Sequence, residues 1–232
     1  MPYQLIITEK PSTSLKIAQA IADKKPEVKK EGKVSYYHLT HNGKEIYIVC
    51  AVGHLFTVME AVKTGWKYPT FDIKWVPSSE AHKESAYTKP YLNVIKKLAK
   101  DANSFVLACD WDIEGEVIGE RILHFICKKN DALRMHYSTT TQDDLRESYE
   151  KISPHIDKGL AEAGITRHEL DYLYGINLSR ALTLSIKNAT GMFKILSSGR
   201  VQGPALNILY EKEKEIAAFK PEPYWEIELK GS

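Results

Sequence analysis

The sequence predicts an α/β protein whose amino-terminal part contains a mainly parallel sheet. Strand-like apolar runs alternate with segments of helical period over residues 1–150, a pattern typical of such sheets. The run Ser104–Cys109 is apolar almost throughout, as expected of a strand buried on both faces. After Pro154 the helical period takes over. We therefore expect an α/β domain over residues 1–150, a mostly helical segment over 151–220, and the first strand of a further β domain over 221–232.

A strand followed by a helix is predicted at the amino terminus. Tyr3–Thr8 is an apolar strand-like run, and Pro11 suits the first turn of the helix after it. Glu9 therefore lies at the carboxyl end of a strand. A hairpin is predicted next, because an Asn-Gly pair favours a tight turn between two strands. Its parts are Val34–Thr40, Asn42-Gly43 and Glu45–Val52.

The later elements follow from the same spacing rules. Residues 60–88, rich in Trp, Tyr, Pro and Lys, are expected to be irregular surface. In chain order we expect a helix at Pro90–Ala102, a strand at Ser104–Cys109, a helix through Val117 and Ile126, a strand at Leu133–Tyr137, a helix from Thr141, a helix through Leu170–Ile186, a loop with Gly199-Arg200, a helix at Pro204–Phe219 and a strand at Tyr224–Lys230. A lone final strand cannot cover its apolar face, so we expect a fragment of a longer protein.

The composition is that of a globular protein in a reducing compartment. The three cysteines have no metal-binding spacing, and an odd number does not suit a disulfide framework. No apolar run approaches the roughly 18 residues of a membrane span, so we expect a cytoplasmic protein without membrane contact. The net charge of +2 says nothing about binding partners, but the distribution of charge along the chain is informative. Residues 176–210 contain basic side chains and no Asp or Glu.

The stretch FVLACDWDIEGE, residues 105–116, places four carboxylates close together directly after a buried strand. Functional groups gather beyond the carboxyl ends of strands in open α/β sheets. Asp110, Asp112 and Glu114 supply the hard oxygen ligands that Mg²⁺ prefers, and Glu9 ends another strand. Helix capping would explain an isolated D-x-D equally well. The second strand-terminal acid, Glu9, favours a Mg²⁺ site.

Glu9 and the D-x-D-x-E-G motif together resemble the TOPRIM domain, a Rossmann-like domain shared by topoisomerases, bacterial-type primases and some nucleases. Further motifs resemble the type IA DNA topoisomerases, in the branch of archaeal topoisomerase I and topoisomerase III. They are Ile7-Thr-Glu-Lys-Pro-Ser12, Ala51-Val-Gly-His-Leu55, Arg167-x-x-x-Asp171-x-x-x-Gly175-Ile-Asn-x-x-Arg180, and Ser198-Gly-Arg-Val-Gln202. The order and spacing agree along essentially the whole chain.

The resemblance implies a reaction and a set of roles. Enzymes of this family cut one DNA strand with a tyrosine, form a 5′-phosphotyrosyl bond, pass a strand through the gap and reseal it, relaxing negative supercoils. Glu9, Asp110, Asp112 and Glu114 would hold Mg²⁺, and Glu9, Lys10 and Arg200 would be catalytic. The nucleophilic tyrosine lies in a later domain of the family, so we expect this chain alone not to cleave DNA.

The partner implied by the resemblance is the single-stranded segment of a negatively supercoiled duplex, together with the remaining domains of the enzyme. Residues 151–220 would be part of a DNA-binding domain. The residues expected to contact DNA are His54, Arg134, Ser138, Thr141, Arg180, Ser198, Gly199, Arg200, Val201 and Gln202. Two alternatives stay open: another TOPRIM enzyme, primase-like or a nuclease, and a non-catalytic DNA-binding module.

Overall fold

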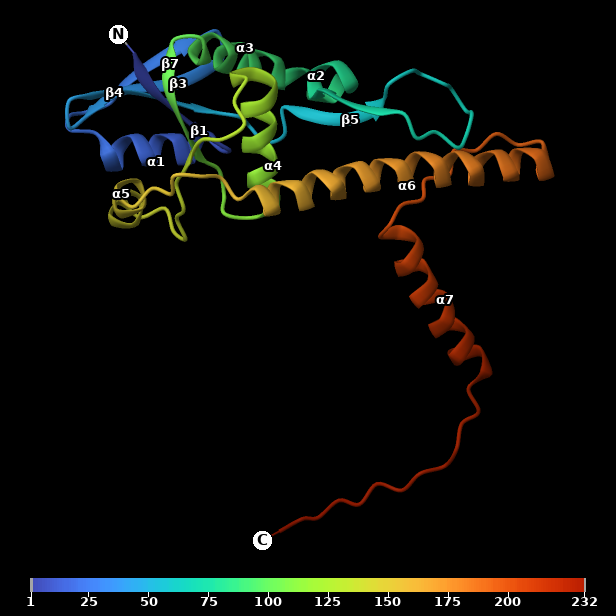
Figure 1. Cartoon of the computed structure of the whole chain (residues 1–232). Helices are drawn as coiled ribbons and strands as arrows, with labels where there is room; N and C mark the ends of the chain where they lie inside the picture. The colour runs from blue at the N-terminus through green and yellow to red at the C-terminus, as the bar shows by residue number, and fades with distance from the viewer. Residues whose placement is uncertain (1, 232) are drawn as a thin grey trace. The chain divides into compact units, whose positions relative to one another are not determined.

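The computed structural model describes residues 2–231 (Figure 1). The chain divides into two compact units, one of residues 1–64 and 71–172 and one of residues 65–70 and 173–232. The elements of the first unit are β1 (Tyr3–Thr8), α1 (Pro11–Ile21), β2 (Glu27–Glu31), β3 (Val34–His41), β4 (Lys44–Cys50), β5 (Phe56–Glu60), β6 (Ile73–Pro77), α2 (Ser78–Ala81), η1 (Lys83–Tyr87), α3 (Thr88–Ala99), β7 (Ala102–Ala108), α4 (Ile113–Ile122), η2 (Leu123–Cys127), β8 (Leu133–Arg134) and α5 (Gln142–Glu150). Helix α6 (Lys158–Thr190) contains the boundary between the units, and α7 (Gln202–Ala218) belongs to the second.

A six-stranded sheet in the order β2-β3-β4-β1-β7-β8 forms the centre of the first unit. Strands β4, β1, β7 and β8 are parallel, and the β2–β3 and β3–β4 pairs are antiparallel. The mainly parallel α/β sheet predicted from the sequence is confirmed. The predicted hairpin is also confirmed: its turn residues Asn42 and Gly43 have positive φ angles of 49° and 76°, which an Asn-Gly pair tolerates best.

Helices cover both faces of this sheet, because successive side chains of a strand point to opposite faces. In β1, Leu5 and Ile7 belong to the core under α3 and α4, whereas Ile6 belongs to the core under α1 and α5. Figure 1 shows α1 and α3 on opposite sides of the sheet. Both cores consist mainly of buried aliphatic side chains, so the parallel strands are packed from two sides.

Two regions differ from the sequence-based expectation. Residues 60–88 contain β6, which pairs with β5 in a second, two-stranded sheet, and the short helices α2 and η1. Short elements rich in Trp, Pro and Lys give too few positions for a periodic signal. The strand predicted at Tyr224–Lys230 is not formed, and the segment is exposed without a β partner among the described residues.

The second unit is organised around the later part of α6. Ser179 and Thr183, one helical turn apart, bind the backbone that returns along the helix. The hydroxyl of Ser179 accepts from Ser198 N at 2.9 Å and donates to Ser198 O at 3.1 Å. Thr183 Oγ1 accepts from Leu196 N at 3.0 Å. These bonds fix the course of residues 196–198 before α7.

Candidate active site

The carboxyl ends of β1 and β7 bring the predicted acidic residues together. Strands β1 and β7 are parallel neighbours, with Thr8 opposite Ala108 in the register. Glu9 therefore follows one strand and Asp110 the other at the same edge of the sheet. Residues about a hundred positions apart in the chain meet there, as the sequence predicted.

The Lys10 ammonium lies between these two carboxylates. Its Nζ atom is 2.6 Å from Asp110 Oδ2 and 3.7 Å from Glu9 Oε1. The hydrogen bond to Asp110 and the charge of Glu9 raise the pKa of Lys10, so the amine stays protonated. This end of the sheet thus already holds a cation between two carboxylates.

The carboxyl group of Glu9 has a raised pKa. Burial raises its pKa above the ordinary value, the neighbouring Asp110 carboxylate adds to the rise, and Lys10 opposes it. A carboxyl group with a raised pKa can hold or release a proton closer to neutral pH than an exposed one. Glu9 is therefore suited to proton transfer as well as to metal binding.

The acidic loop is shaped by Asp112 and Gly115. Asp112 caps α4, and its Oδ1 accepts a hydrogen bond from Gly115 N at 2.7 Å. A Cβ atom on Gly115 would lie 2.1 Å from the carbonyl oxygen of Asp110. Only glycine permits this close approach, which turns the chain sharply from β7 into α4. Asp112 can both cap α4 and serve as a metal ligand, because the cap engages only one of its two carboxylate oxygens.

Arg134 lies in the core beneath this loop. Its side chain is fully buried and pairs with the equally buried Glu116, with Nε 2.5 Å from Oε1. The guanidinium also donates to the carbonyl oxygens of Cys109 and Asp110, at 2.8 and 2.9 Å. The DNA contact predicted for Arg134 does not fit this placement, since its donors are directed to internal acceptors. Arg134 instead fixes the backbone from which Asp110 projects.

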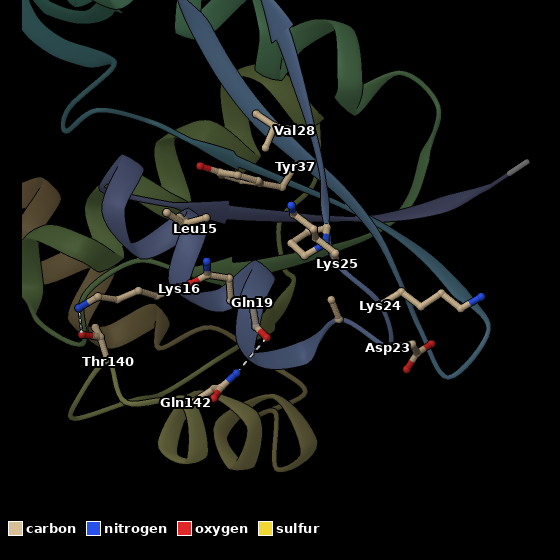
Figure 2. A pocket seen from close by; sticks show the side chains of 12 residues that line it. Leu15, Lys16, Gln19, Asp23, Lys24, Lys25, Val28, Tyr37, Thr140 and Gln142 are labelled. Atoms are coloured by element: carbon tan, nitrogen blue, oxygen red, sulfur yellow. Dashed lines mark hydrogen bonds between the residues drawn. The ribbon is translucent and has the colours of Figure 1, made fainter.

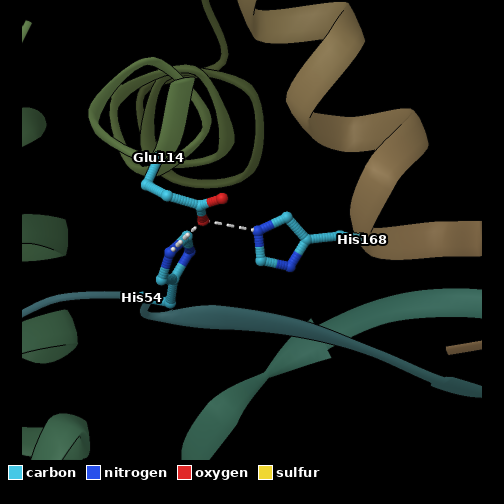
Figure 3. Close-up of side chains that lie close together, drawn as sticks. All are labelled: His54, Glu114 and His168. Carbon is cyan, nitrogen blue, oxygen red and sulfur yellow. Dashed lines mark hydrogen bonds and ion pairs between the residues drawn. The ribbon is translucent and has the colours of Figure 1, made fainter. Parts of the chain in front are cut away.

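Glu114 is turned toward another group of side chains (Figure 3). Its Oε2 is 2.8 Å from His168 Nε2 and 3.0 Å from His54 Nε2. Its Oε1 is 3.3 Å from Arg167 Nη1. Burial acts to raise the pKa of Glu114, but the hydrogen bond and charge of His168, with the charges of His54 and Arg167, lower it overall.

The predicted four-carboxylate cluster is therefore divided in two. Among residues 2–231, the group of His, Cys, Asp and Glu whose donor atoms all lie within 4.8 Å of one another is His54, Glu114 and His168. Glu9, Asp110 and Asp112 form a wider arrangement around Lys10. His54, which the sequence predicts to contact DNA, lies beside Glu114, and burial and the charge of His168 lower its pKa.

A cavity of about 650 Å³ adjoins the acidic end of the sheet. Its wall carries cations, carboxylates and hydroxyls, including the exposed Ser138 predicted to contact DNA. Trp111 also lines it, more than half exposed, and stacks on His136 with ring centroids 4.7 Å apart and an interplanar angle of 16°. The lining residues are Lys10, Ser12, Thr13, Lys16, Asp110, Trp111, Asp112, Tyr137, Ser138, Thr139 and Thr140. Thr141, also predicted, is exposed next to this wall and 3.1 Å from Thr139 through their hydroxyls.

A second cavity of about 720 Å³ shares Lys16 and Thr140 with the first (Figure 2). Lys16 Nζ donates to Thr140 Oγ1 at 2.6 Å, and Gln142 Nε2 donates to Gln19 O at 3.3 Å. Lys24 and Lys25 lie on its far wall. Lysine side chains thus extend along the surface away from the acidic residues.

The remaining predicted contacts belong to the second unit. Arg180 is largely buried, and its Nη1 donates to Lys67 O at 2.9 Å. Asn177 binds the same loop: its Oδ1 accepts from Thr70 N at 2.7 Å and its Nδ2 donates to Thr70 O at 2.8 Å. Arg200 is exposed, as are Val201 and Gln202, whereas Ser198 and Gly199 are partly buried.

Three residues of the site were missed by the sequence-based reasoning. His168 is one of many polar residues in a long helix, and nothing local connects it to Glu114. Glu116 was counted in the acidic stretch, but its burial could not be read from that stretch. Trp111 stands between Asp110 and Asp112. An aromatic residue between these two acids was the one feature of the sequence that could have identified it as part of the site.

The carboxylates present at this edge fit a hard dication. Mg²⁺ prefers carboxylate and water oxygens, and Glu9, Asp110 and Asp112 offer such donors beside an ammonium that offsets part of their negative charge. Among the described residues, no helix is both long and apolar enough for a membrane crossing.

Comparisons with known proteins agree with these features. A model of the Toprim domain matches residues 4–140, and a DNA topoisomerase model matches residues 155–232. The chain is 48% identical over 225 residues to DNA topoisomerase 1 of Methanocaldococcus jannaschii, covering 97% of this chain and 29% of that protein. It is 44% identical over 227 residues to DNA topoisomerase 1 of Pyrococcus horikoshii, covering 97% of this chain and 33% of that protein.

A solved structure has the same fold. The chain matches full-length topoisomerase I from Thermotoga maritima with a TM-score of 0.60 and 21% identity, over 94% of this chain and 31% of that one. The chain thus spans about a third of the length of the proteins that it resembles.

Proposed function

Because this chain belongs to the DNA topoisomerase family and carries a Toprim domain at residues 4–140, we propose that it supplies the Mg²⁺ site and part of the DNA groove of a type IA enzyme. The proposed reaction is transient cleavage of one strand through a 5′-phosphotyrosine, strand passage and religation, which relaxes negative supercoils. The observation that carries the proposal is the meeting of Glu9, Lys10 and Asp110 at the carboxyl ends of β1 and β7.

The ammonium of Lys10 is proposed to bind the phosphate at the break. It is half exposed and forms one wall of the cavity that also presents the hydroxyls of Ser12 and Ser138. An ammonium attracts phosphate as a point charge, and hydroxyls add hydrogen bonds that fix its orientation. These groups would hold the 5′-phosphoryl end and the 3′-hydroxyl end close enough to rejoin.

Glu9 is proposed to handle the proton of the 3′-hydroxyl. Its burial and its proximity to Asp110 raise its pKa, so the carboxyl group can accept a proton during religation and return it during cleavage. Glu9, Asp110 and Asp112 would hold Mg²⁺, whereas the Glu114 carboxylate is directed to His54 and His168. The ion would supply a positive charge that orients the phosphate and the 3′-oxygen.

The nucleophilic tyrosine is assigned to a part of the enzyme outside the 232 residues of this chain. The hydroxyl of Tyr137 donates to Ala108 O at 2.9 Å within the core, and burial raises its pKa. The hydroxyl of Tyr172 accepts a hydrogen bond from Glu60 N at 2.9 Å. Both phenols are engaged in structural bonds, so neither is proposed as the nucleophile.

The test pairs a binding measurement with an activity measurement. Replacing Asp110 and Asp112 by Asn should abolish Mg²⁺ binding by this chain, measured by calorimetry. In an enzyme as long as the relatives, the same double change should stop religation. The control is Asp143→Asn, an exposed acid in the first turn of α5, which should change neither result. Normal Mg²⁺ binding and normal relaxation by the double variant would refute the assignment. Relaxation of supercoiled DNA by the 232-residue chain alone would refute the proposal that the nucleophilic tyrosine lies elsewhere in the enzyme.

A further inference from the structure

His54, Glu114 and His168 converge from three separate segments of the first unit (Figure 3). His54 lies in the loop between β4 and β5, Glu114 in the first turn of α4, and His168 in α6. Both imidazoles direct Nε2 at the same carboxylate oxygen, Oε2, at 2.8 and 3.0 Å. The three donor atoms all lie within 4.8 Å of one another.

This donor set differs in chemistry from the carboxylates around Lys10. Imidazole nitrogen is a borderline ligand that suits zinc and its neighbours in the first transition row, whereas Mg²⁺ prefers oxygen. Two histidines and one carboxylate are also a recurrent ligand set for zinc with one position left open. We propose that His54, Glu114 and His168 form a second metal site, which binds one dication of the zinc class separately from Mg²⁺.

The geometry requires little rearrangement. Zinc–nitrogen and zinc–oxygen bonds of about 2.0–2.2 Å in a tetrahedron place neighbouring donors about 3.4 Å apart. The two nitrogen–oxygen distances are a few tenths of an ångström shorter than that. The imidazoles therefore need to move apart only slightly, each exchanging its hydrogen bond for a metal bond. The side chains are about one third exposed, so water can occupy the fourth position.

Neighbouring groups hold the three ligands in this orientation. Arg167 Nη1 lies 3.3 Å from Glu114 Oε1, which leaves Oε2 facing the imidazoles. The indole of Trp75 packs against the His168 ring at 5.8 Å, and its Nε1 donates to Glu169 Oε1 at 2.9 Å. Outer groups of this kind commonly determine the affinity of a metal site.

An ion bound there would cross-link three segments of the first unit. It would attach α6 to α4 and to the loop after β4, and it would engage Glu114 outside the Mg²⁺ group. Since a ligand that binds only the folded state stabilises it, zinc should raise the melting temperature. The bound ion is thus expected to hold these three segments together beside the acids that are proposed to be catalytic.

Cobalt(II) titration of this chain followed by visible absorption tests the proposal. Four-coordinate Co²⁺ with nitrogen ligands absorbs far more strongly than the hydrated ion. We expect one strongly absorbing Co²⁺ per chain, displaced by Zn²⁺ and not by excess Mg²⁺. His54→Gln and His168→Gln should each weaken Zn²⁺ binding at least about tenfold and remove the band.

Matched variants separate this site from the Mg²⁺ group. His82→Gln changes an exposed histidine outside the cluster and should leave the spectrum unchanged. Asp110→Asn with Asp112→Asn should abolish Mg²⁺ binding and keep the cobalt band. Melting curves in EDTA establish that each variant folds, and two separate histidine variants guard against the failure of one.

The proposal is overturned if wild type gives no strong band, or if the band survives in either folded histidine variant. It is also overturned if the band disappears in the double aspartate variant, because the ion would then belong to the carboxylates. In the double aspartate variant, loss of Mg²⁺ binding with the cobalt band retained supports both sites, whereas the reverse result contradicts both assignments.

Discussion

Arg134 and Glu116 form an ion pair in which neither side chain has any exposed surface. The pair lies under the acidic loop, where Arg134 also binds the carbonyls of Cys109 and Asp110. A buried charge that loses its partner is costly, commonly by about 3–5 kcal/mol. We therefore expect Arg134→Met to lower the free energy of unfolding by about that amount in urea titrations.

The same reasoning gives a control and a coupled variant. Lys151→Met breaks the exposed pair with Glu147 and should leave the free energy of unfolding nearly unchanged, because water already screens this pair. Arg134→Met combined with Glu116→Leu should cost less than the sum of the single changes, because no unpaired charge remains. Equal losses in Arg134→Met and Lys151→Met would contradict the structural role of this pair.

Gly115 controls the position of Asp110. In Gly115→Ala the new methyl group would meet backbone atoms of Asp110 at 2.1–3.1 Å, so the loop must shift. We expect Mg²⁺ affinity, measured by calorimetry, to fall about tenfold or more. The matched control is Gly159→Ala in the first turn of α6, where the contact is an ordinary 3.5 Å. That change should leave Mg²⁺ binding intact and favour the helix by up to about 1 kcal/mol.

The exposed face of Trp111 should stack on an unpaired base. Its ring rests on His136 and borders the cavity beside the acids. Since stacking on an aromatic side chain contributes about 1–3 kcal/mol per base, Trp111→Ala should weaken binding of single-stranded DNA by about 5- to 150-fold. Fluorescence anisotropy with a labelled oligonucleotide measures this. Trp111→Phe should retain most of the affinity, and a full loss in that variant would argue against stacking.

The buried thiols predict a loss of stability at alkaline pH. Burial raises the pKa of Cys50 to about 11 and that of Cys109 to about 12, whereas an unfolded thiol ionises near about 8.5. Above that lower value the unfolded chain loses the protons first, so the free energy of unfolding falls as pH rises. The slope approaches about 1.4 kcal/mol per pH unit for each thiol.

Urea titrations between about pH 8 and pH 10, in the presence of a reductant, measure that slope. Cys50→Ala with Cys109→Ala should make the dependence shallower, because both raised groups are removed. An unchanged slope in the double variant would show that other groups cause the loss.

The sequence was most informative where a residue's role is local or follows a strand. The parallel core strands, the Asn42-Gly43 turn and the positions of Glu9 and Asp110 all follow from periodicity, turn chemistry and the meeting of strand ends. Arg134 could not be placed this way, because a charged residue in a short strand gives no sign that its guanidinium points inward. The contact of Glu114 with His168 bridges 54 positions and depends on packing that no local pattern encodes.

The end of the chain shows a different limit. Tyr224–Lys230 alternates like a strand, but alternation describes a strand only when a neighbouring strand is present to pair with it. The prediction for this segment failed because sheet formation is a property of two segments.

Lys10 is in effect a counterion tethered by a covalent bond to the residue beside it. With its ammonium against Asp110, Lys10 offsets part of the negative charge at the acidic end of the sheet. If the proposed dication left, one ammonium would remain among three carboxylates, which reduces their mutual repulsion. Exchange of the proposed ion would therefore carry a smaller electrostatic penalty at this edge than three carboxylates without a tethered cation would impose.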